Sequence, residues 1–267
     1  MENIDRNLAI GVFDSGVGGI SVLADLIRIL PEEDFIYLGD CLNIPYGTKD
    51  VEEARKLTIA AVEFLLEKGI KALVIACNTA TSAAITHLRD WLEIPVVGME
   101  PALKPAVESG EDGSVVVMAT PMTLRERKFN SLMEKYRERA DIIPLPCPGL
   151  VELIEEGKLE GEEVENLLEQ LSLPLKDKRI SSVVLGCTHY PLIKDAIQRV
   201  YGEDVRIIDG NMGTARQLKR LLDKNGLSID KGRGKGNLQI FTFGDEGKVI
   251  PLCRLLLDTM LNRKEDI

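Results

Sequence analysis

Short apolar runs alternate with longer amphipathic segments along almost the whole chain, and this alternation most constrains the fold. Runs such as LAIGVF at 8–13 and ISSVVLG at 180–186 read as strands. Segments such as 51–67 and 122–138 carry apolar residues at helical spacing. Alternation of this kind predicts an α/β protein with mostly parallel sheets. The other predicted strands lie at 34–38, 70–76, about 95, 114–119, 141–146, 205–208 and 238–243.

The predicted strands before the C-terminal one form two sets of four, which indicates two similar lobes. The boundary between the sets is expected in IPVVGMEPALKPAVESGEDGS, where prolines and a charged loop follow the fourth strand. A chain of 267 residues is long enough for one large domain or two of modest size. In folds of this class, loops at the carboxyl ends of the strands form the ligand crevice.

Composition and charge exclude several classes of function. The formal net charge is −10 and acids and bases are interleaved, so binding of nucleic acid is not expected. The chain has no run of 18 apolar residues, and its N-terminus lacks the features of a signal peptide, which predicts a cytoplasmic protein without a membrane span. Five scattered cysteines, without a CxxC pair or a His/Cys cluster, predict neither a disulfide framework nor a structural metal site.

Two cysteines stand in nearly the same local sequence. Cys77 in LVIACNTA and Cys187 in VVLGCTHY each follow a predicted strand and precede a predicted helix start. A helix N-terminus lowers the pKa of a thiol, so both are candidates for reactive cysteines. Cys41, Cys147 and Cys253 are interpreted instead as small buried hydrophobes.

Two thiols on opposite sides of a crevice suit a reaction that inverts a stereocentre, because one base removes the α-proton and an acid opposite returns another. An alternative is a hydrolase in which His189 activates Cys187, but it leaves Cys77 unexplained. A two-lobed amino-acid-binding module without chemistry is a third hypothesis. A pyridoxal enzyme is disfavoured because no lysine stands in a phosphate-binding setting. His87 lies within a helical run and is interpreted as structural or exposed.

The glycine-rich turn FDSGVGG at 13–19 follows the first strand and opens a helix. It fits only two positions of a dinucleotide-binding motif, since Ser21 stands where the third glycine belongs. Its backbone N–H groups are able to bind a carboxylate at a helix N-terminus, with Asp14 and Ser15 at the mouth. The simpler alternative is that Asp14 or Ser15 caps the helix.

The chain resembles the glutamate racemases. FDSGVGG, GDCLNIPYGTK, VIACNTAT, LPCPGLVELIEEG and VLGCTHYPL occur in the order found in that family, and the resemblance covers nearly the whole chain. Related aspartate racemases typically carry an acid where this chain has His189, which favours glutamate. The resemblance implies cofactor-independent interconversion of L- and D-glutamate, supplying D-glutamate for peptidoglycan. Another amino-acid racemase of the same family is the close alternative.

The resemblance also implies residue roles. Cys77 would exchange the proton on the D-glutamate side and Cys187 on the L-glutamate side, assisted by Asp14 and His189. It implies a first lobe of about 1–98 plus 209–267, a second lobe of 99–208, and an active site between them. Many members are dimers, which allows a homodimer here. Glu155 matches an auxiliary acid, although Glu152 and Glu156 are close by. The substrate-binding positions implied are Ser15, Tyr46, Gly47, Asn78, Thr79, Thr120 and Thr188.

Two segments depart from the family pattern. Cys41, Leu42 and Asn43 stand where many members have Thr-Ala-Arg, which makes Cys41 a candidate for oxidation near the cleft. Glu100 stands where some members have other residues, and the sequence leaves open a role in helix capping or in lobe movement.

Overall fold

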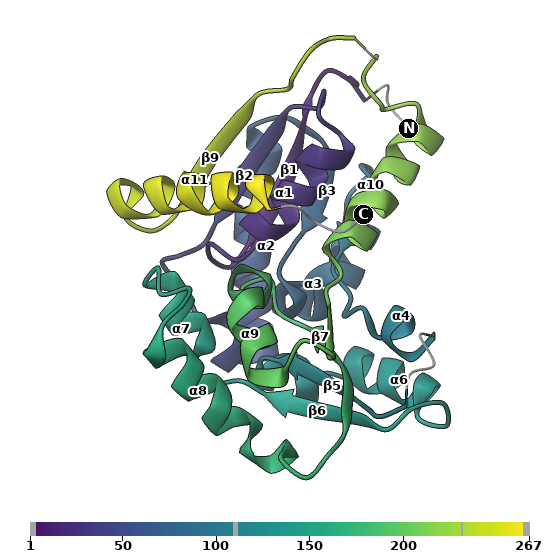
Figure 1. The fold of residues 1–267 in the computed structure, drawn as a ribbon. Coiled ribbons are helices and arrows are strands. Elements are labelled where there is room, and N and C mark those ends of the chain that lie inside the picture. Colours follow the sequence, from purple (N-terminus) through teal and green to yellow (C-terminus); the bar gives the residue numbers. More distant parts are fainter. Residues whose placement is uncertain (1–3, 109–111, 231, 264–267) are drawn as a thin grey trace.

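Two parallel sheets with helices around them make up the structure (Figure 1). It is a computed structural model that describes residues 4–108, 112–230 and 232–263. The five-stranded sheet has the order β4-β3-β1-β2-β9, and the four-stranded sheet has the order β6-β5-β7-β8. We call the parts built on these sheets the first lobe and the second lobe. The strands are β1 (Ala9–Asp14), β2 (Phe35–Gly39), β3 (Ile70–Ile75), β4 (Val96–Gly98), β5 (Ser114–Ala119), β6 (Ile142–Pro146), β7 (Ile180–Leu185), β8 (Arg206–Ile208) and β9 (Leu238–Thr242).

The two lobes share one strand order. In each lobe the first strand, β1 or β5, lies between the second and the third, and the fourth lies beyond the third. The pairing of first and third strands even begins with a register shift in both lobes. The predicted α/β fold with two similar lobes is therefore confirmed. In a sheet of this order, the ligand crevice forms at the carboxyl ends of the first and third strands, where the chain leaves in opposite directions.

The C-terminal segment lies in the first lobe. Strand β9 pairs in parallel with β2, and helices α10 and α11 both pack against α1. The lobe boundaries at 98/99 and 208/209 stay a prediction. The helices are α1 (Ile20–Ile29), α2 (Val51–Glu67), α3 (Asn78–Trp91), α4 (Leu103–Glu108), α5 (Pro121–Arg125), α6 (Arg127–Tyr136), α7 (Leu150–Glu155), α8 (Glu162–Ser172), α9 (Lys194–Tyr201), α10 (Asn211–Asn225) and α11 (Glu246–Asn262), with 3-10 turns η1 (Tyr46–Thr48), η2 (Leu173–Leu175) and η3 (Tyr190–Ile193).

One predicted helical segment is divided in the structure. Residues 51–67 form α2 as expected, but 122–138 contains two helices that meet at Glu126, whose backbone is extended. Helix α5 packs against α3 and η1 of the first lobe, whereas α6 packs against α4 of its own lobe. A single straight helix cannot make both contacts, and helical periodicity alone gives no sign of the break.

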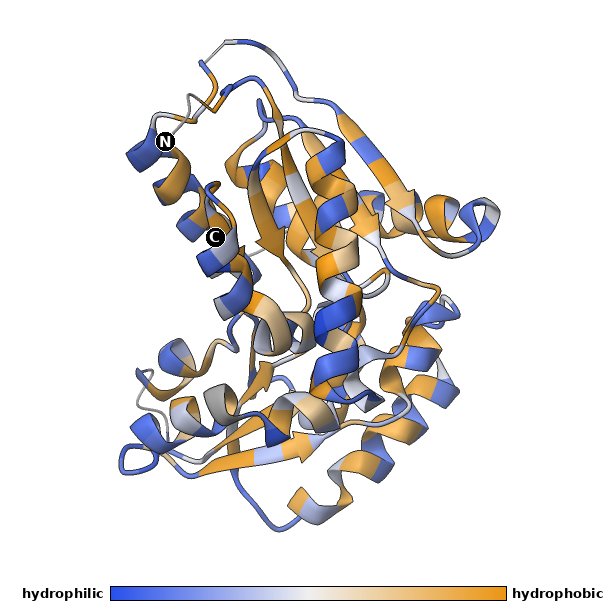
Figure 2. Cartoon of the chain, turned by 180° about the vertical axis from the view of Figure 1, so that it is seen from behind, coloured by the Kyte–Doolittle hydropathy of each residue, from blue (hydrophilic) through white to orange (hydrophobic). Residues whose placement is uncertain are grey.

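The central strands, such as β3 and β5, are buried on both faces, as their nearly continuous apolar sequences require. Figure 2 shows this as largely hydrophobic strands surrounded by helices whose outer faces are hydrophilic. One apolar cluster joins the lobes, since it contains Val17 and Ile20 of the first lobe together with Ile154 and Tyr190 of the second. Within the described residues, none of the helices has both the length and the apolar character needed to cross a membrane.

Candidate active site

Cys77 follows β3 at its carboxyl end and caps helix α3. Its Sγ atom accepts the backbone N–H of Ala80 at 3.4 Å, and the Ser15 hydroxyl donates to the same sulfur at 3.3 Å. Burial raises the pKa of Cys77 to about 12, and the charge of the nearby Asp14 adds to this effect. The prediction of a lowered pKa is therefore wrong, because the loss of hydration outweighs the two hydrogen bonds that the sulfur accepts.

Cys187 occupies the equivalent place in the second lobe, after the third strand β7. A Cβ atom on the preceding Gly186 would lie 2.9 Å from the carbonyl oxygen of Met118, so the close approach of β7 to β5 requires glycine. The predicted helix start differs here, because the 3-10 turn η3 intervenes before α9. The neighbour of Cys187 is instead His189, whose Nδ1 lies 3.7 Å from the sulfur.

Glu155 connects His189 to the first lobe. Its Oε1 atom lies 2.6 Å from His189 Nε2 and accepts the backbone N–H of Val17 at 2.6 Å. Burial by itself lowers the pKa of His189, but the contacts with Cys187 and Glu155 outweigh it and hold that pKa well above its ordinary value. These contacts therefore favour the imidazolium form of His189. Glu152 and Glu156 are exposed, so Glu155 is the acid of this segment that contacts the histidine.

Asp14 ends β1 and is completely buried. It accepts the backbone N–H of Gly16 at 2.9 Å and, from the other lobe, the Thr188 hydroxyl at 3.0 Å. Burial raises the pKa of Asp14 to about 6, although the charge of His189 opposes this shift. The alternative in which Asp14 or Ser15 caps the following helix is wrong, because α1 begins later, at Ile20, and has no side-chain cap.

The glycine turn does bind a carboxylate, but the carboxylate belongs to Glu155. A Cβ atom on Gly16 would lie 2.1 Å from Oε1 of Glu155, and one on Gly18 would lie 2.4 Å from Nδ1 of His189. Both positions therefore need glycine because the opposite lobe approaches the backbone directly. The turn is part of the contact between the lobes.

Both cysteines open onto one cavity of about 20 Å³ that is lined from both lobes. A space of this size holds about one water molecule, so a larger ligand enters only when the lining moves apart. Asp14 and Glu155 are outside the lining and reach it through Thr188 and His189. The lining includes Cys77, Cys187 and His189 and all the predicted substrate-binding positions, Ser15, Tyr46, Gly47, Asn78, Thr79, Thr120 and Thr188.

Comparison with known proteins places this geometry in a family. The family model described as Asp/Glu/Hydantoin racemase matches residues 10–218. The chain belongs to this family. A glutamate racemase of Clostridium novyi is 56% identical over 252 residues, covering 94% of this chain and 97% of the relative. A glutamate racemase of Clostridium perfringens is 52% identical over 259 residues, covering 97% of this chain and 99% of that protein.

Solved structures agree with the family assignment. The glutamate racemase of Francisella tularensis in complex with D-glutamate has a TM-score of 0.82 at 32% identity, covering 98% of each chain. The Escherichia coli glutamate racemase in complex with L-glutamate and an activator also has a TM-score of 0.82, at 30% identity, covering 93% of this chain and 95% of that one. An aspartate racemase of Picrophilus torridus, 16% identical with a TM-score of 0.55, shares the fold.

In this member of the Asp/Glu/hydantoin racemase family, two buried residues outside the lining, Asp40 and Thr123, contact the lining and were not predicted from the sequence. Asp40 is buried and accepts the Tyr46 hydroxyl at 2.7 Å, and its place directly after β2 was a usable signal. Thr123 completes a triangle of hydroxyls with Thr79 and Thr120, at separations of 3.0–3.1 Å. No local pattern distinguishes the apolar lining residues Ile44, Pro45 and Val151 from ordinary core residues.

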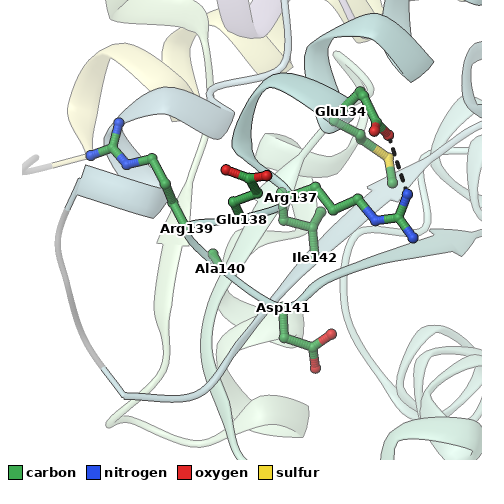
Figure 3. Close-up of a pocket in the computed structure, with 8 residues that line it drawn as sticks. Glu134, Arg137, Glu138, Arg139, Ala140, Asp141 and Ile142 are labelled. Carbon is green, nitrogen blue, oxygen red and sulfur yellow. Dashed lines mark ion pairs between the residues drawn. The ribbon is translucent and has the colours of Figure 1, made fainter.

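Two larger hollows lie away from the thiols. One of about 750 Å³ lies where α6 leads into β6, and Figure 3 shows Glu134 paired with Arg137 at its edge. Another of about 830 Å³ lies beside α10 and is lined by Arg89, Glu100 and Arg216, among others. Among the described residues that line them, neither hollow has a cysteine, a histidine or any predicted site residue, so volume alone does not identify the site.

The remaining cysteines fit the interpretation as small hydrophobes. Cys147 and Cys253 are buried, Cys41 is partly buried, and all are free thiols. Burial raises the pKa of Cys147 and of Cys253 to about 12. Across the part of the chain that the structure describes, no group of three or more His, Cys, Asp or Glu side chains is placed to hold a metal ion.

Proposed function

We propose that the protein is a glutamate racemase that uses Cys77 and Cys187 as its two acid–base groups. The observation that carries the proposal is their placement after the third strand of two lobes with the same strand order, on one shared cavity. Relatives at 52–56% identity over nearly the whole chain support glutamate as the substrate. The carboxyl-end crevices of the two sheets thus face one substrate from two sides.

In the D-to-L direction, a Cys77 thiolate removes the α-proton and becomes a thiol. The Cys187 thiol then donates its proton to the opposite face of the carbanion and becomes a thiolate. The reverse direction exchanges these roles, so each turnover moves one proton onto one sulfur and one off the other. The proton inventory of the substrate is unchanged, and only its configuration inverts.

Each thiol has its own assistance in this scheme. The His189 imidazolium lies beside the sulfur of Cys187, where a negative charge remains after proton donation. At Cys77, the Ser15 hydroxyl and the Ala80 amide stabilise the thiolate, and protonation of Asp14 removes a charge that opposes its formation. With a pKa of about 6, Asp14 can exchange a proton near neutral pH.

Apart from His189, neutral polar groups would hold the substrate, since the cavity lining, within the described residues, includes no lysine or arginine. The Oδ1 atom of Asn78 is buried without a hydrogen-bond partner in the described part of the chain, which is costly unless a ligand supplies a donor. We assign it to the substrate ammonium group. The threonine hydroxyls and Ser15 are donors suited to the carboxylates and to the charge that develops at the α-carbon.

The proposal is tested by incubating the reduced protein, without added cofactor, with L-glutamate in D₂O. Loss of the α-proton signal in NMR together with decay of optical rotation is the expected result. Absence of both would contradict the proposal. A parallel incubation with L-aspartate separates glutamate racemase from the related alternative. The Cys/His hydrolase, which the Cys187–His189 distance of 3.7 Å leaves as a second candidate, requires no Cys77 and no exchange at the α-carbon.

The wider role follows from the product. We propose that D-glutamate made in the cytoplasm supplies peptidoglycan synthesis, as the family resemblance implies. A homodimer is part of the same proposal, and sedimentation of the purified chain with and without glutamate measures it.

A further inference from the structure

The turn that carries Cys187 and His189 is hydrogen-bonded to a residue at the end of the C-terminal helix, Arg263. Arg263 donates from Nη1 to the carbonyl oxygen of Pro191 at 2.8 Å and from Nη2 to that of Leu192 at 3.2 Å. Its Nη2 atom also lies 3.3 Å from a carboxylate oxygen of Asp195 in the first turn of α9. One guanidinium therefore binds three consecutive parts of the second lobe.

Arg263 is itself anchored in the first lobe. Its backbone N–H bonds to the carbonyls of Thr259 and Met260, which ends α11. From α1, Arg28 donates to the carbonyl oxygen of Met260 and, at 3.5 Å, to that of Arg263. Helix α11, yellow in Figure 1, lies against α1, which begins at the end of the glycine turn. The arginine that binds η3 thus belongs to the lobe that carries Asp14 and Cys77.

Backbone hydrogen bonds inside the turn connect the residues that Arg263 holds to Cys187 and His189. The backbone N–H of Tyr190 bonds to the carbonyl of Cys187 at 3.2 Å, and that of Leu192 bonds to the carbonyl of His189 at 3.0 Å. On the opposite side, the Ser21 hydroxyl donates to the carbonyl of Thr188 at 2.8 Å. The segment from Cys187 to Leu192 is therefore fixed at one end by Ser21 and at the other by Arg263.

We propose that Arg263 is a positioning residue for Cys187, which aligns this thiol and His189 with the substrate whenever the lobes are together. The inference rests on the proposed racemase function. It predicts a defect confined to proton transfer at Cys187, because Cys77 lies after β3 and has no contact with Arg263 or η3 among the hydrogen bonds that the structure describes. The forked, permanently charged guanidinium suits two carbonyls in a way that a lysine ammonium does not.

Direction-resolved isotope effects separate this role from a general structural one. The two enantiomers have equal free energy in water, so kcat/KM must be the same in both directions for every variant. A misaligned Cys187 makes its own transfer more rate-limiting. The α-deuterium effect on kcat/KM should then rise from L-glutamate, which Cys187 deprotonates, and fall from D-glutamate. A general loosening of the fold would change the isotope effects from L-glutamate and from D-glutamate in the same sense.

The experiment compares wild type with Arg263→Ala, Arg263→Lys and the matched control Arg254→Ala, an exposed arginine of the same helix. We expect Arg263→Ala to lower kcat about tenfold with KM within about twofold, because small misplacements of a reacting group are costly. Arg263→Lys should lie between it and wild type, and Arg254→Ala should match wild type. If the alanine variant does not fold, as thermal melting would show, the lysine variant carries the isotope test.

The outcomes distinguish the two proposals. A wild type that racemises glutamate, with Arg263 variants whose isotope effects change in opposite senses, supports the positioning role. Unchanged kinetics, or α-deuterium effects that change in the same sense from L-glutamate and from D-glutamate, would overturn that role and leave the racemase proposal intact. A wild type without racemisation would overturn both.

Discussion

The surroundings of the two thiols differ although their positions in the two lobes are equivalent. Cys77 is stabilised by neutral donors, the Ser15 hydroxyl and the Ala80 amide, whereas Cys187 lies beside an imidazolium paired with Glu155. A repeated scaffold thus supplies two matching places, and the residues after each strand make them chemically different. This is reasonable for a racemase, because the two faces of an amino acid's α-carbon are not interchangeable within one chiral site.

Each lobe also donates a hydrogen bond to a carboxylate of the other lobe. The second lobe provides the Thr188 hydroxyl for Asp14, and the first lobe provides the Val17 amide for Glu155. Each thiol's partner is therefore held from across the cavity. Separation of the lobes would release both partners together, so the two halves of the reaction depend on the same closure.

The largest loss of activity is expected when either thiol is removed. Cys77→Ser and Cys187→Ser should each lower racemisation by about 10²–10⁴-fold, because a serine hydroxyl is a far weaker acid than a thiol. The comparison predicts losses of similar size in both variants, measured by circular dichroism from either enantiomer. Full activity in Cys77→Ser would contradict the two-thiol scheme and favour chemistry at Cys187 alone.

The next effect concerns Asp14. Asp14→Asn should lower kcat by about 10²-fold, in the range for loss of an acid–base group. It should also stabilise the fold above about pH 6, by roughly 2 kcal/mol, since it removes a buried carboxylate at the expense of one hydrogen bond.

The pH dependence of this stability difference follows from the raised pKa of Asp14. The folded state binds the Asp14 proton more tightly than the unfolded state, so the stability that this proton adds is present below the ordinary aspartate pKa of 3.8 and is lost as the pH rises through about 6. Urea unfolding at pH 4 and pH 7.5 measures it. The free energy of unfolding of Asp14→Asn relative to wild type should be higher at pH 7.5 than at pH 4. An equal difference at both pH values would show that Asp14 is not a buried carboxylate of raised pKa.

A smaller effect, about tenfold on kcat, is expected for Glu155→Gln, which removes the carboxylate that holds the His189 proton. The pKa of His189 should fall toward its ordinary value. The chain has two histidines, so the imidazole proton resonances in NMR report both, and the exposed His87 is an internal control. The stability difference from wild type should be greatest below the ordinary histidine pKa of 6.5 and shrink as the pH rises through the raised pKa. An unmoved His189 titration would show that Glu155 does not control this proton.

The smallest effect is expected for a thiol outside the cavity. Cys253 is completely buried in the core cluster, so Cys253→Ala should destabilise the fold by about 1 kcal/mol while activity stays within about twofold of wild type. Thermal melting and the racemisation assay measure both. A large loss of activity would mean that buried thiols in general, rather than the pair at the strand ends, are needed.

Much of the fold could be predicted because strands covered on both faces have conspicuous apolar sequences. All of the predicted runs became strands, and α2 spans 51–67 as expected. The break at Glu126 could not be predicted, since it results from α5 and α6 packing against different partners. The cysteines were visible because their motifs repeat, whereas the role of Thr123 depends on its contact with Thr79 from a distant segment.

The sequence by itself determined the elements, their alternation and the position of both cysteines at strand ends, because these depend on local periodicity and short motifs. Only the tertiary structure decided which of three nearby glutamates contacts His189, and that the glycine turn binds the Glu155 carboxylate. It also decided the protonation of the site: burial raises the pKa values of Cys77 and Asp14, against the helix-dipole expectation for the thiol. The physical reason is that hydration and charge contacts depend on residues far away in the sequence, which meet only when the two lobes pack together.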